Sequence, residues 1–116
     1  MEVDWFVGEI RSFAGDFAPQ GWSFCDGRQL PITRNEALFS LIGDYYGGDG
    51  RSNFKLPDLR SRVPIGFDDK NEIGRTEGSE NAVTAGNPGH THSILQPVIA
   101  LNYIIAINGI FPTRPW

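Results

Sequence analysis

The chain has 116 residues, which suits a single domain over residues 1–116, and its 10 basic and 14 acidic residues give a net charge of −4. This charge lacks the basic footprint of nucleic-acid-binding proteins, so we expect no nucleic-acid partner. The single cysteine, Cys25, excludes an intrachain disulfide, and the longest apolar run, residues 98–107, is too short for a membrane span of about 20 residues.

The N-terminal third is predicted to form short strands. Residues 6–13 alternate partly between apolar and polar side chains, which is typical of a short strand. Residues 22–24 and 30–32 also alternate, on either side of Asp26 and Gly27. An Asp-Gly dipeptide between two such runs favours a two-residue hairpin.

The clearest helix is predicted at about residues 34–42, within "TRNEALFSLIG". Thr33 and Glu36 have the spacing of a capping box, and Gly43 is well placed to end the helix. Helical spacing gives one apolar face that we expect to pack in the core, formed by Ala37, Leu38, Leu41 and Ile42.

The loops after the helix are rich in glycine and charge. The Gly47–Gly50 stretch lacks the oxygen ligands and closing Glu of an EF-hand loop, so we expect a tight turn. Residues 56–59 are predicted to form an extended, anchored turn, because Pro57 keeps the preceding residue out of the helical region. A solvent-facing ion-pair cluster that ties the loops together is expected from Asp58, Arg60 and Arg62.

The last third of the chain changes from polar to apolar. Residues 68–89 are polar, rich in glycine and poor in apolar side chains, and we expect an extended or mobile segment there. The following segment is rich in β-branched residues, which is typical of a strand buried on both faces. In a small domain such a strand needs cover, for which another subunit is a candidate. The residues that define it are Val98, Ile99, Ile104, Ile105 and Ile107.

The only two histidines, His90 and His92, lie one residue apart. In a strand their imidazoles would point to the same side, about 6–7 Å apart. Two ligands are too few for a metal site in a monomer, but three chains around a threefold axis would supply about six nitrogens, an octahedral set that suits Zn, Fe(II) or Ni. The alternative is a pair of loop histidines bonded to backbone or water.

No motif of a catalytic class is present: there is no nucleophile elbow, zinc-protease motif or nucleotide loop. Cys25 has no histidine near it in the sequence, and we expect a buried thiol without a catalytic role. Adjacent acids such as Asp68 and Asp69 are typical of a solvated loop. We therefore predict no catalytic residues and no enzyme activity.

Five segments carry a resemblance to a known family. They are "GEIRSFAG", "APQGWSFCDGRQLPI", "ALFSLIGDYYGGDGRSNFKLPDLRSRVPIG", "GHTHS" and "LQPVIALNYIIAINGIFP". In this order they resemble the phage tail collar domain family, which includes microcystin-dependent-protein-like bacterial members and the collar region of phage short tail fibres. The resemblance implies a tail-collar-like α+β fold of mostly short β-strands and ordered loops with one short helix.

The resemblance also implies a homotrimer at a fibre tip, with a divalent metal, zinc or iron, held on the threefold axis by His90 and His92. No other cofactor is implied. In the family the tip contacts a cell-surface glycan such as lipopolysaccharide, and this contact is attributed to a long insert after the His-x-His motif. Here only Ser93, Ile94 and, at most, Leu95 separate that motif from the next matching segment, so the chain resembles a minimal form of the collar scaffold.

These observations predict a non-enzymatic structural and adhesion module, a tail-fibre tip or cap protein of a phage or phage-derived particle. Its expected partners are further copies of itself and other tail or particle proteins. We expect it in the virion or particle, made in the cytoplasm without a signal peptide because residues 1–4 lack the start of one.

The alternative function is a carbohydrate-binding module that recognises cell-surface glycans by stacking sugar rings on aromatic side chains. Packing of the same side chains in a core or an interface is the competing interpretation. The candidate ligand-binding residues are Trp5, Tyr45, Tyr46 and Trp116.

Overall fold

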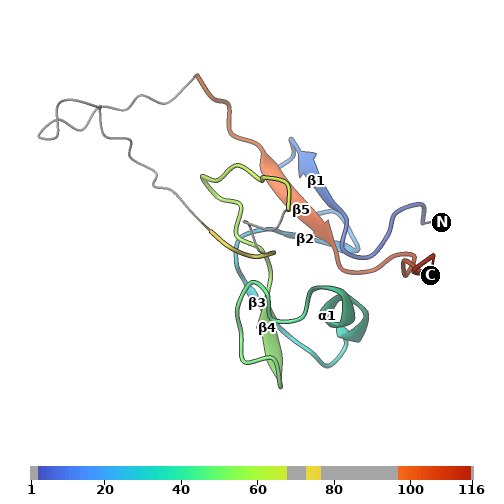
Figure 1. The fold of residues 1–116 in the computed structure, drawn as a ribbon. Helices are drawn as coiled ribbons and strands as arrows, with labels where there is room; N and C mark the ends of the chain where they lie inside the picture. Colours follow the sequence, from blue (N-terminus) through green and yellow to red (C-terminus); the bar gives the residue numbers. More distant parts are fainter. Residues whose placement is uncertain (1–2, 68–72, 77–96, 116) are drawn as a thin grey trace, which may run out of the picture.

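Two small antiparallel sheets and one helix make up the described part of the chain, which is residues 3–67, 73–76 and 97–115 of the computed structural model (Figure 1). This is the α+β fold of short strands, ordered loops and one short helix that the sequence predicts. Within the described residues, no helix has the length and apolar character needed to cross a bilayer.

The larger sheet has the order β1-β5-β2, with the C-terminal strand in the middle. The strand predicted at residues 6–13 is confirmed in its second half as β1, Ile10–Phe13. It pairs antiparallel with β5, Asn102–Ala106, which pairs on its other side with β2, Trp22–Phe24. A parallel bridge between Phe6 and Ile110 extends the contact between the two ends of the chain.

The smaller sheet pairs β3, Gln29–Pro31, with β4, Asn53–Lys55. The hairpin predicted around Asp26 and Gly27 is therefore wrong, because the runs on either side of it belong to different sheets. β2 pairs with β5, which contains Ile104 and Ile105, and β3 pairs with β4 on the other side of the helix in the sequence. The Asp-Gly dipeptide serves as the crossing point between the sheets.

The helix α1 spans Glu36–Ile42 and ends at Gly43 as predicted, with the Gly43 N–H donating to the carbonyl of Phe39 at 2.7 Å. The predicted capping box is wrong. The N-cap is Asn35, without a side-chain cap bond, and Glu36 accepts a hydrogen bond from the N–H of Arg34 at 3.1 Å. Thr33 is excluded from the cap because the chain first makes a turn in which Arg34 takes a φ of 75°.

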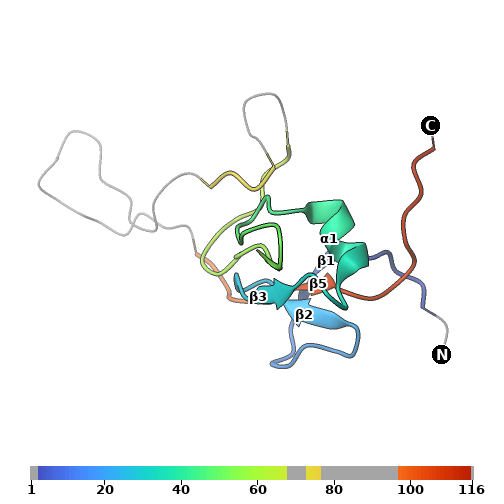
Figure 2. The same cartoon turned by 90° about the horizontal axis from the view of Figure 1, so that it is seen from below.

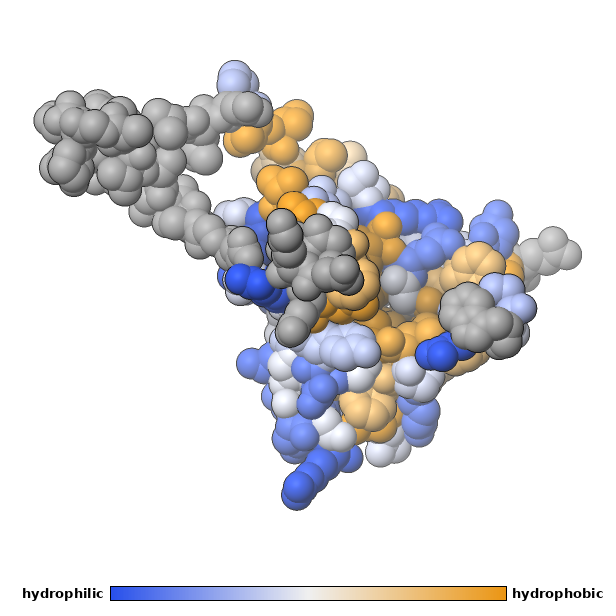
Figure 3. Space-filling model, viewed as in Figure 1, coloured by the Kyte–Doolittle hydropathy of each residue, from blue (hydrophilic) through white to orange (hydrophobic). Residues whose placement is uncertain are grey.

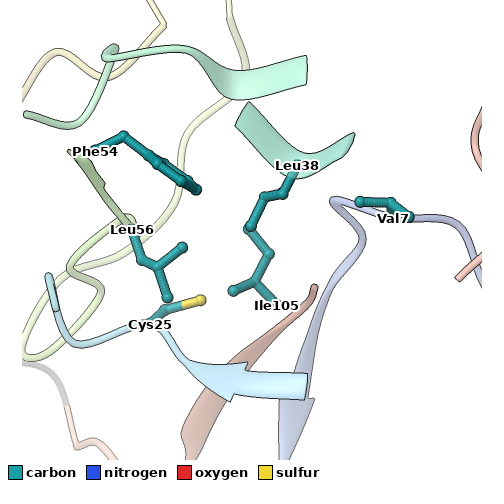
Figure 4. Close-up of a cluster of buried hydrophobic side chains, with 6 residues drawn as sticks. All are labelled: Val7, Cys25, Leu38, Phe54, Leu56 and Ile105. Carbon is teal, nitrogen blue, oxygen red and sulfur yellow. The ribbon is translucent and has the colours of Figure 1, made fainter. Parts of the chain in front are cut away.

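The core lies between the helix and one face of the larger sheet (Figure 4). Leu38 is its only fully buried helical residue, and Phe39 packs on Phe54 with ring centroids 5.3 Å apart. Ala37, expected on the apolar face, is exposed. The buried members of this cluster are Val7, Cys25, Leu38, Phe54, Leu56 and Ile105.

Strand β5 is buried on both faces, as predicted for this part of the chain. Ile105 is 1% exposed in the helix-side core, and Ile104 is 3% exposed in a second cluster on the opposite face. The chain itself provides this cover, so β5 needs no second subunit. Val98 and Ile99, expected to share the burial, are instead 80% and 84% exposed, because they lie beyond the ends of both neighbouring strands.

The Gly47–Gly50 stretch forms a tight turn, as predicted. The Asp49 carboxylate accepts hydrogen bonds from the backbone N–H groups of the three residues that follow Gly50, at 2.8, 2.9 and 3.1 Å, and these bonds lower its pKa. Gly48 has a φ of +91°, and a Cβ there would lie 2.5 Å from the Cα of Phe54. These backbone hydrogen bonds account for the lowered pKa of Asp49 without a bound cation.

Leu38→Ala is expected to reduce the free energy of unfolding by about 2–5 kcal/mol, because it removes a fully buried side chain and leaves a cavity. Leu41→Ala is the matched control, since Leu41 lies on the same helix and is only partly buried. Urea denaturation of both variants measures the difference. Equal losses for the two variants would contradict the packing described above.

Candidate functional site

A groove of about 750 Å³ lies on the face of the larger sheet opposite α1. Arg11 and Phe13 of β1, Ile104 of β5 and Trp22 of β2 line it. Arg11 and Ile104 are directly opposite in the ladder, so their side chains share one face of the sheet. Ser12 of β1 also lines it, and the loops add a rim formed by Val3, Trp5, Pro19, Gln20, Gly21 and Asn108. We call this surface the Trp5 groove.

Trp5 is held in one orientation at the edge of the Trp5 groove. Its indole N–H donates to the carbonyl of Asn108 at 2.8 Å, and its backbone carbonyl accepts from the N–H of Ile110 at 2.9 Å. The ring packs on Trp22 with centroids 5.4 Å apart and an interplanar angle of 52°. Gly109 permits this packing, because a Cβ there would lie 2.8 Å from Trp5 Cδ1.

Arg11 lies over the second tryptophan of the groove. Its guanidinium carbon is 5.3 Å from the centroid of the Trp22 ring, a distance at which a cation–π attraction operates. The same guanidinium pairs with Glu9 at 2.9 Å. The groove therefore combines two tryptophans with a paired cation.

The structure brings only one of the four predicted ligand-binding aromatics into this groove. Trp5 lines it, whereas Tyr45 and Tyr46 do not. Tyr45 is 56% exposed on the loop after α1, and Tyr46 is half-buried, with a pKa raised by its burial. Trp116 lies outside the described residues. Sequence reasoning missed Trp22 and Arg11, which the alternation of β1 and β2 placed on the same face.

The predicted metal ligands His90 and His92 also lie outside the described residues, so their geometry is not part of the fold above. Among residues 3–67, 73–76 and 97–115, no group of three or more His, Cys, Asp or Glu side chains lies close enough together to hold a metal ion. The metal assignment remains a prediction from the sequence.

A clasp of two Asp-x-Arg turns joins the two sheets. Asp26 and Asp58 face each other in an isolated antiparallel bridge, in which the Leu59 N–H donates to the Cys25 carbonyl at 2.9 Å. Arg28 binds the Asp26 carboxylate through Nε and Nη2, at 3.0 and 2.8 Å. We call this arrangement, with its counterpart at Asp58, the Asp-Arg clasp.

The second turn of the clasp repeats the first. Arg60 binds Asp58 through Nε and Nη2, at 2.9 and 2.8 Å, and Arg62 donates to the Asp58 carbonyl at 3.0 Å. The Arg60 bonds lower the pKa of Asp58 to about 2, and the Arg28 bonds hold the pKa of Asp26 below its ordinary value. The predicted cluster of Asp58, Arg60 and Arg62 is confirmed, but Asp26 and Arg28 were missed, although the repeated Asp-x-Arg spacing is visible in the sequence.

Cys25 is the buried thiol that the sequence predicts. It is 3% exposed, and burial, with a smaller contribution from the charge of Asp26, raises its pKa to about 12. A thiol with this pKa stays protonated at neutral pH and is a poor nucleophile. Its role is packing in the core.

Exposed apolar side chains gather where the chain enters β5, beside the loop that follows the clasp (Figure 3). The two segments are neighbours, because Leu59 and Arg60 line a pocket of about 220 Å³ together with Leu101 and Asn102. We call this surface the apolar patch. Its members are 51–84% exposed: Val63, Ile65, Phe67, Val98, Ile99 and Leu101.

The described fold has an Asp-Arg clasp between its two sheets and large apolar side chains on its surface. Residues 8–64 match the family described as the Phage Tail Collar Domain. This match agrees with the family that the sequence resembles, which is a family of phage tail structural modules. No curated protein matches the chain.

The match spans β1 to β4 and the Asp-Arg clasp and ends before the His pair and β5. The likeness of residues 89–93 and 95–112 to the family is therefore still a prediction. So is the missing insert between them.

Asp58→Asn is expected to lower stability at neutral pH, by up to about 1 kcal/mol as for other solvent-accessible ion pairs. The carboxylate has a pKa of about 2 in the folded chain against an ordinary value of 3.8. Because the folded pKa is the lower one, its contribution is complete above about pH 4 and is lost as the pH falls towards 2. Urea unfolding between pH 7 and pH 2 measures this loss.

The Asn variant should lose less stability than the wild type across that acid window. Asp16→Asn is the matched control, since Asp16 makes no hydrogen bond or ion pair with any other described residue. An acid dependence of Asp58→Asn identical to that of the wild type would show that the clasp does not stabilise the fold.

Proposed function

We propose that this chain is a non-enzymatic structural and adhesion module at the tip or cap of a tail fibre, in a phage or a phage-derived particle, and that it works as a homotrimer. Its partners would be two further copies of itself and other tail or particle proteins. The phage tail collar domain supports the tail-fibre setting. The apolar patch is the observation that carries the proposal of self-association.

The apolar patch has the chemistry of a protein interface. Large apolar patches exposed on a protein surface mark interaction sites. Arg60 and Arg62, which precede it in the sequence, are engaged with Asp58. A surface of this kind gains stability when another apolar surface covers it.

The exposure of consecutive residues favours more than one neighbour. Val98 and Ile99 are adjacent, and their exposed fractions are 80% and 84%, so apolar side chains of this segment are exposed to solvent on more than one side. A partner on one side would leave the other apolar side in water. Two flanking copies around a threefold axis would cover both, which supports a trimer over a dimer.

Native mass spectrometry tests the trimer, which should have three times the 12.9 kDa mass of the chain. Ile99→Asp is expected to shift the protein to monomer, because a buried unpaired carboxylate costs several kcal/mol and so weakens association by at least about 100-fold. Tyr45→Asp is the control, since Tyr45 is exposed outside the patch and its variant should remain trimeric. A monomeric wild type, or a trimeric Ile99→Asp variant, would refute the proposal.

The same spectra test the proposed metal on the threefold axis. Three copies of His90 and His92 would provide an all-imidazole octahedral set for zinc or iron. The wild-type trimer should then carry one ion that a chelator removes, and His90→Ala/His92→Ala should carry none. A trimer whose mass equals that of the polypeptides alone, without chelator, would rule the site out.

Glycan binding is the second candidate function, and the place of Trp5 in a groove with Gln20 and Asn108 favours it, because amide side chains suit sugar hydroxyls. The separation of Trp5 from the tyrosines after α1 restricts such a site to one part of the surface. Addition of a lipopolysaccharide core oligosaccharide, with the Trp5 and Trp22 indole signals followed by NMR, tests it.

A further inference from the structure

Asn108 differs from the other asparagines of the described structure because its side-chain amide makes no hydrogen bond. The amides of Asn35 and Asn102 donate to backbone carbonyls at 2.9 and 2.7 Å. The amide of Asn53 accepts from the N–H of Asp49 at 3.0 Å and donates to its carboxylate at 3.3 Å. Asn108 is exposed, and its amide has no such partner among the described residues, so no bond restrains the rotation of its side chain.

The residue that follows Asn108 is a glycine whose backbone N–H is also without an acceptor in the described part of the chain. The two residues lie in a bend after β5 and form the only Asn-Gly pair of the sequence. The neighbouring N–H groups, those of Asn108 and Ile110, donate to the carbonyls of Gly21 and Trp5 at 3.2 and 2.9 Å. Because Gly109 has no Cβ, its nitrogen is open to approach by the side chain of the preceding residue.

Trp5 acts on the same peptide unit through its carbonyl. The indole N–H of Trp5 donates to the Asn108 carbonyl at 2.8 Å, and resonance joins this carbonyl to the Gly109 nitrogen. When that nitrogen loses its proton, negative charge develops on the carbonyl oxygen, where a fixed donor stabilises it. The Trp5 bond therefore raises the fraction of the Gly109 nitrogen that is deprotonated and able to attack.

We propose that Asn108 is a self-modification site, at which the side-chain amide is lost through attack by the Gly109 nitrogen and Trp5 promotes the reaction. The Gly109 nitrogen gives its proton to solvent and bonds to Cγ of Asn108. The bond from Cγ to the side-chain nitrogen breaks, and that nitrogen takes a proton from solvent and leaves as ammonia. Water then opens the succinimide ring, at Cγ to give aspartate or at the main-chain carbonyl to give isoaspartate, with nothing oxidised or reduced.

Isoaspartate at this position changes the link between the two ends of the chain. The main chain then runs through Cβ and Cγ, so it is one methylene longer, and the carbonyl that Trp5 binds becomes part of a carboxylate. Ile110 accepts from the N–H of Val7 at 3.0 Å and donates to the Trp5 carbonyl at 2.9 Å. Figure 2 shows both ends leaving the larger sheet on the same side. The longer link displaces Ile110 relative to Trp5 and so alters the edge of the Trp5 groove.

The test incubates the full chain at mildly alkaline pH and follows each asparagine by peptide mapping with mass spectrometry. Deamidation adds the mass difference between a hydroxyl and an amino group, and chromatography separates the aspartate and isoaspartate products. Asn108 should react at least about 10-fold faster than the other described asparagines, because breaking a hydrogen bond and passing a Cβ both add to their barrier. These comparison sites are Asn35, Asn53 and Asn102.

Trp5→Phe keeps an aromatic ring and removes the indole N–H. The rate at Asn108 should fall by about 5-fold, which is the effect of one hydrogen bond. A purely structural role of Trp5 predicts the opposite, since a loosened bend reacts at the same rate or faster. Trp22→Phe is the matched control, because Trp22 lines the same groove without a hydrogen bond to the Asn108 carbonyl. In urea, where the Trp5 bond is absent, the wild type and Trp5→Phe should react equally fast.

The Trp5 indole signal in NMR spectra supplies a second readout. Aged wild-type protein should show a second Trp5 signal, whereas an Asn108→Gln chain, which cannot form the succinimide, should keep one. An Asn108 that stays intact while another described asparagine is deamidated would overturn the proposal. A Trp5→Phe chain that reacts at the wild-type rate or faster, or more slowly in urea as well, would also overturn it.

Discussion

The fold depends on the pairing of β5 with β1 on one side and β2 on the other. This pairing brings the last part of the chain between two strands from its beginning. It also places consecutive isoleucines in two separate clusters: Ile105 packs under α1 with Leu38 and Leu56, and Ile104 packs against Trp22. The helix-side core and the floor of the Trp5 groove therefore depend on the same five-residue strand.

The Asp-Arg clasp connects the larger sheet to the smaller one. The bridge between Asp26 and Asp58 connects the end of β2 with the segment after β4, so the smaller sheet takes its position from the larger one. Each aspartate is also the acceptor for an arginine two residues later, which satisfies both charges at an accessible site. The clasp thus fixes the chain direction that leads to the apolar patch.

The two surfaces discussed above have different chemistry, and each suits a different role in an assembly. The apolar patch is an aliphatic and aromatic surface next to a neutralised ion-pair cluster, which suits burial between copies. The Trp5 groove has a tryptophan held by a hydrogen bond, a second tryptophan packed on it and a paired arginine. Both lie on a domain whose family is one of tail-fibre structural modules.

The sequence alone determined the local features that depend on near neighbours. Gly43 ends α1 because a glycine tolerates the φ of 52° found there, and Cys25 is buried because a free cysteine usually packs as a small apolar side chain. The double-faced burial around Ile104 and Ile105 also followed from a nearly continuous apolar run rich in β-branched residues. The family could be inferred because the matching segments are local motifs in a set order.

Only the tertiary structure decided which strands pair and which aromatics share a surface. The Asp26-Gly27 dipeptide favours a hairpin, yet β2 pairs with a strand 80 to 84 residues further along the chain, and no local pattern reports the stability of that pairing. Trp5 and Trp22 meet because the chain ends are joined through Ile110, a contact across more than a hundred residues. The free energy of pairing distant strands can outweigh a local turn preference. Its size depends on the packing between the paired strands, which only the folded structure shows.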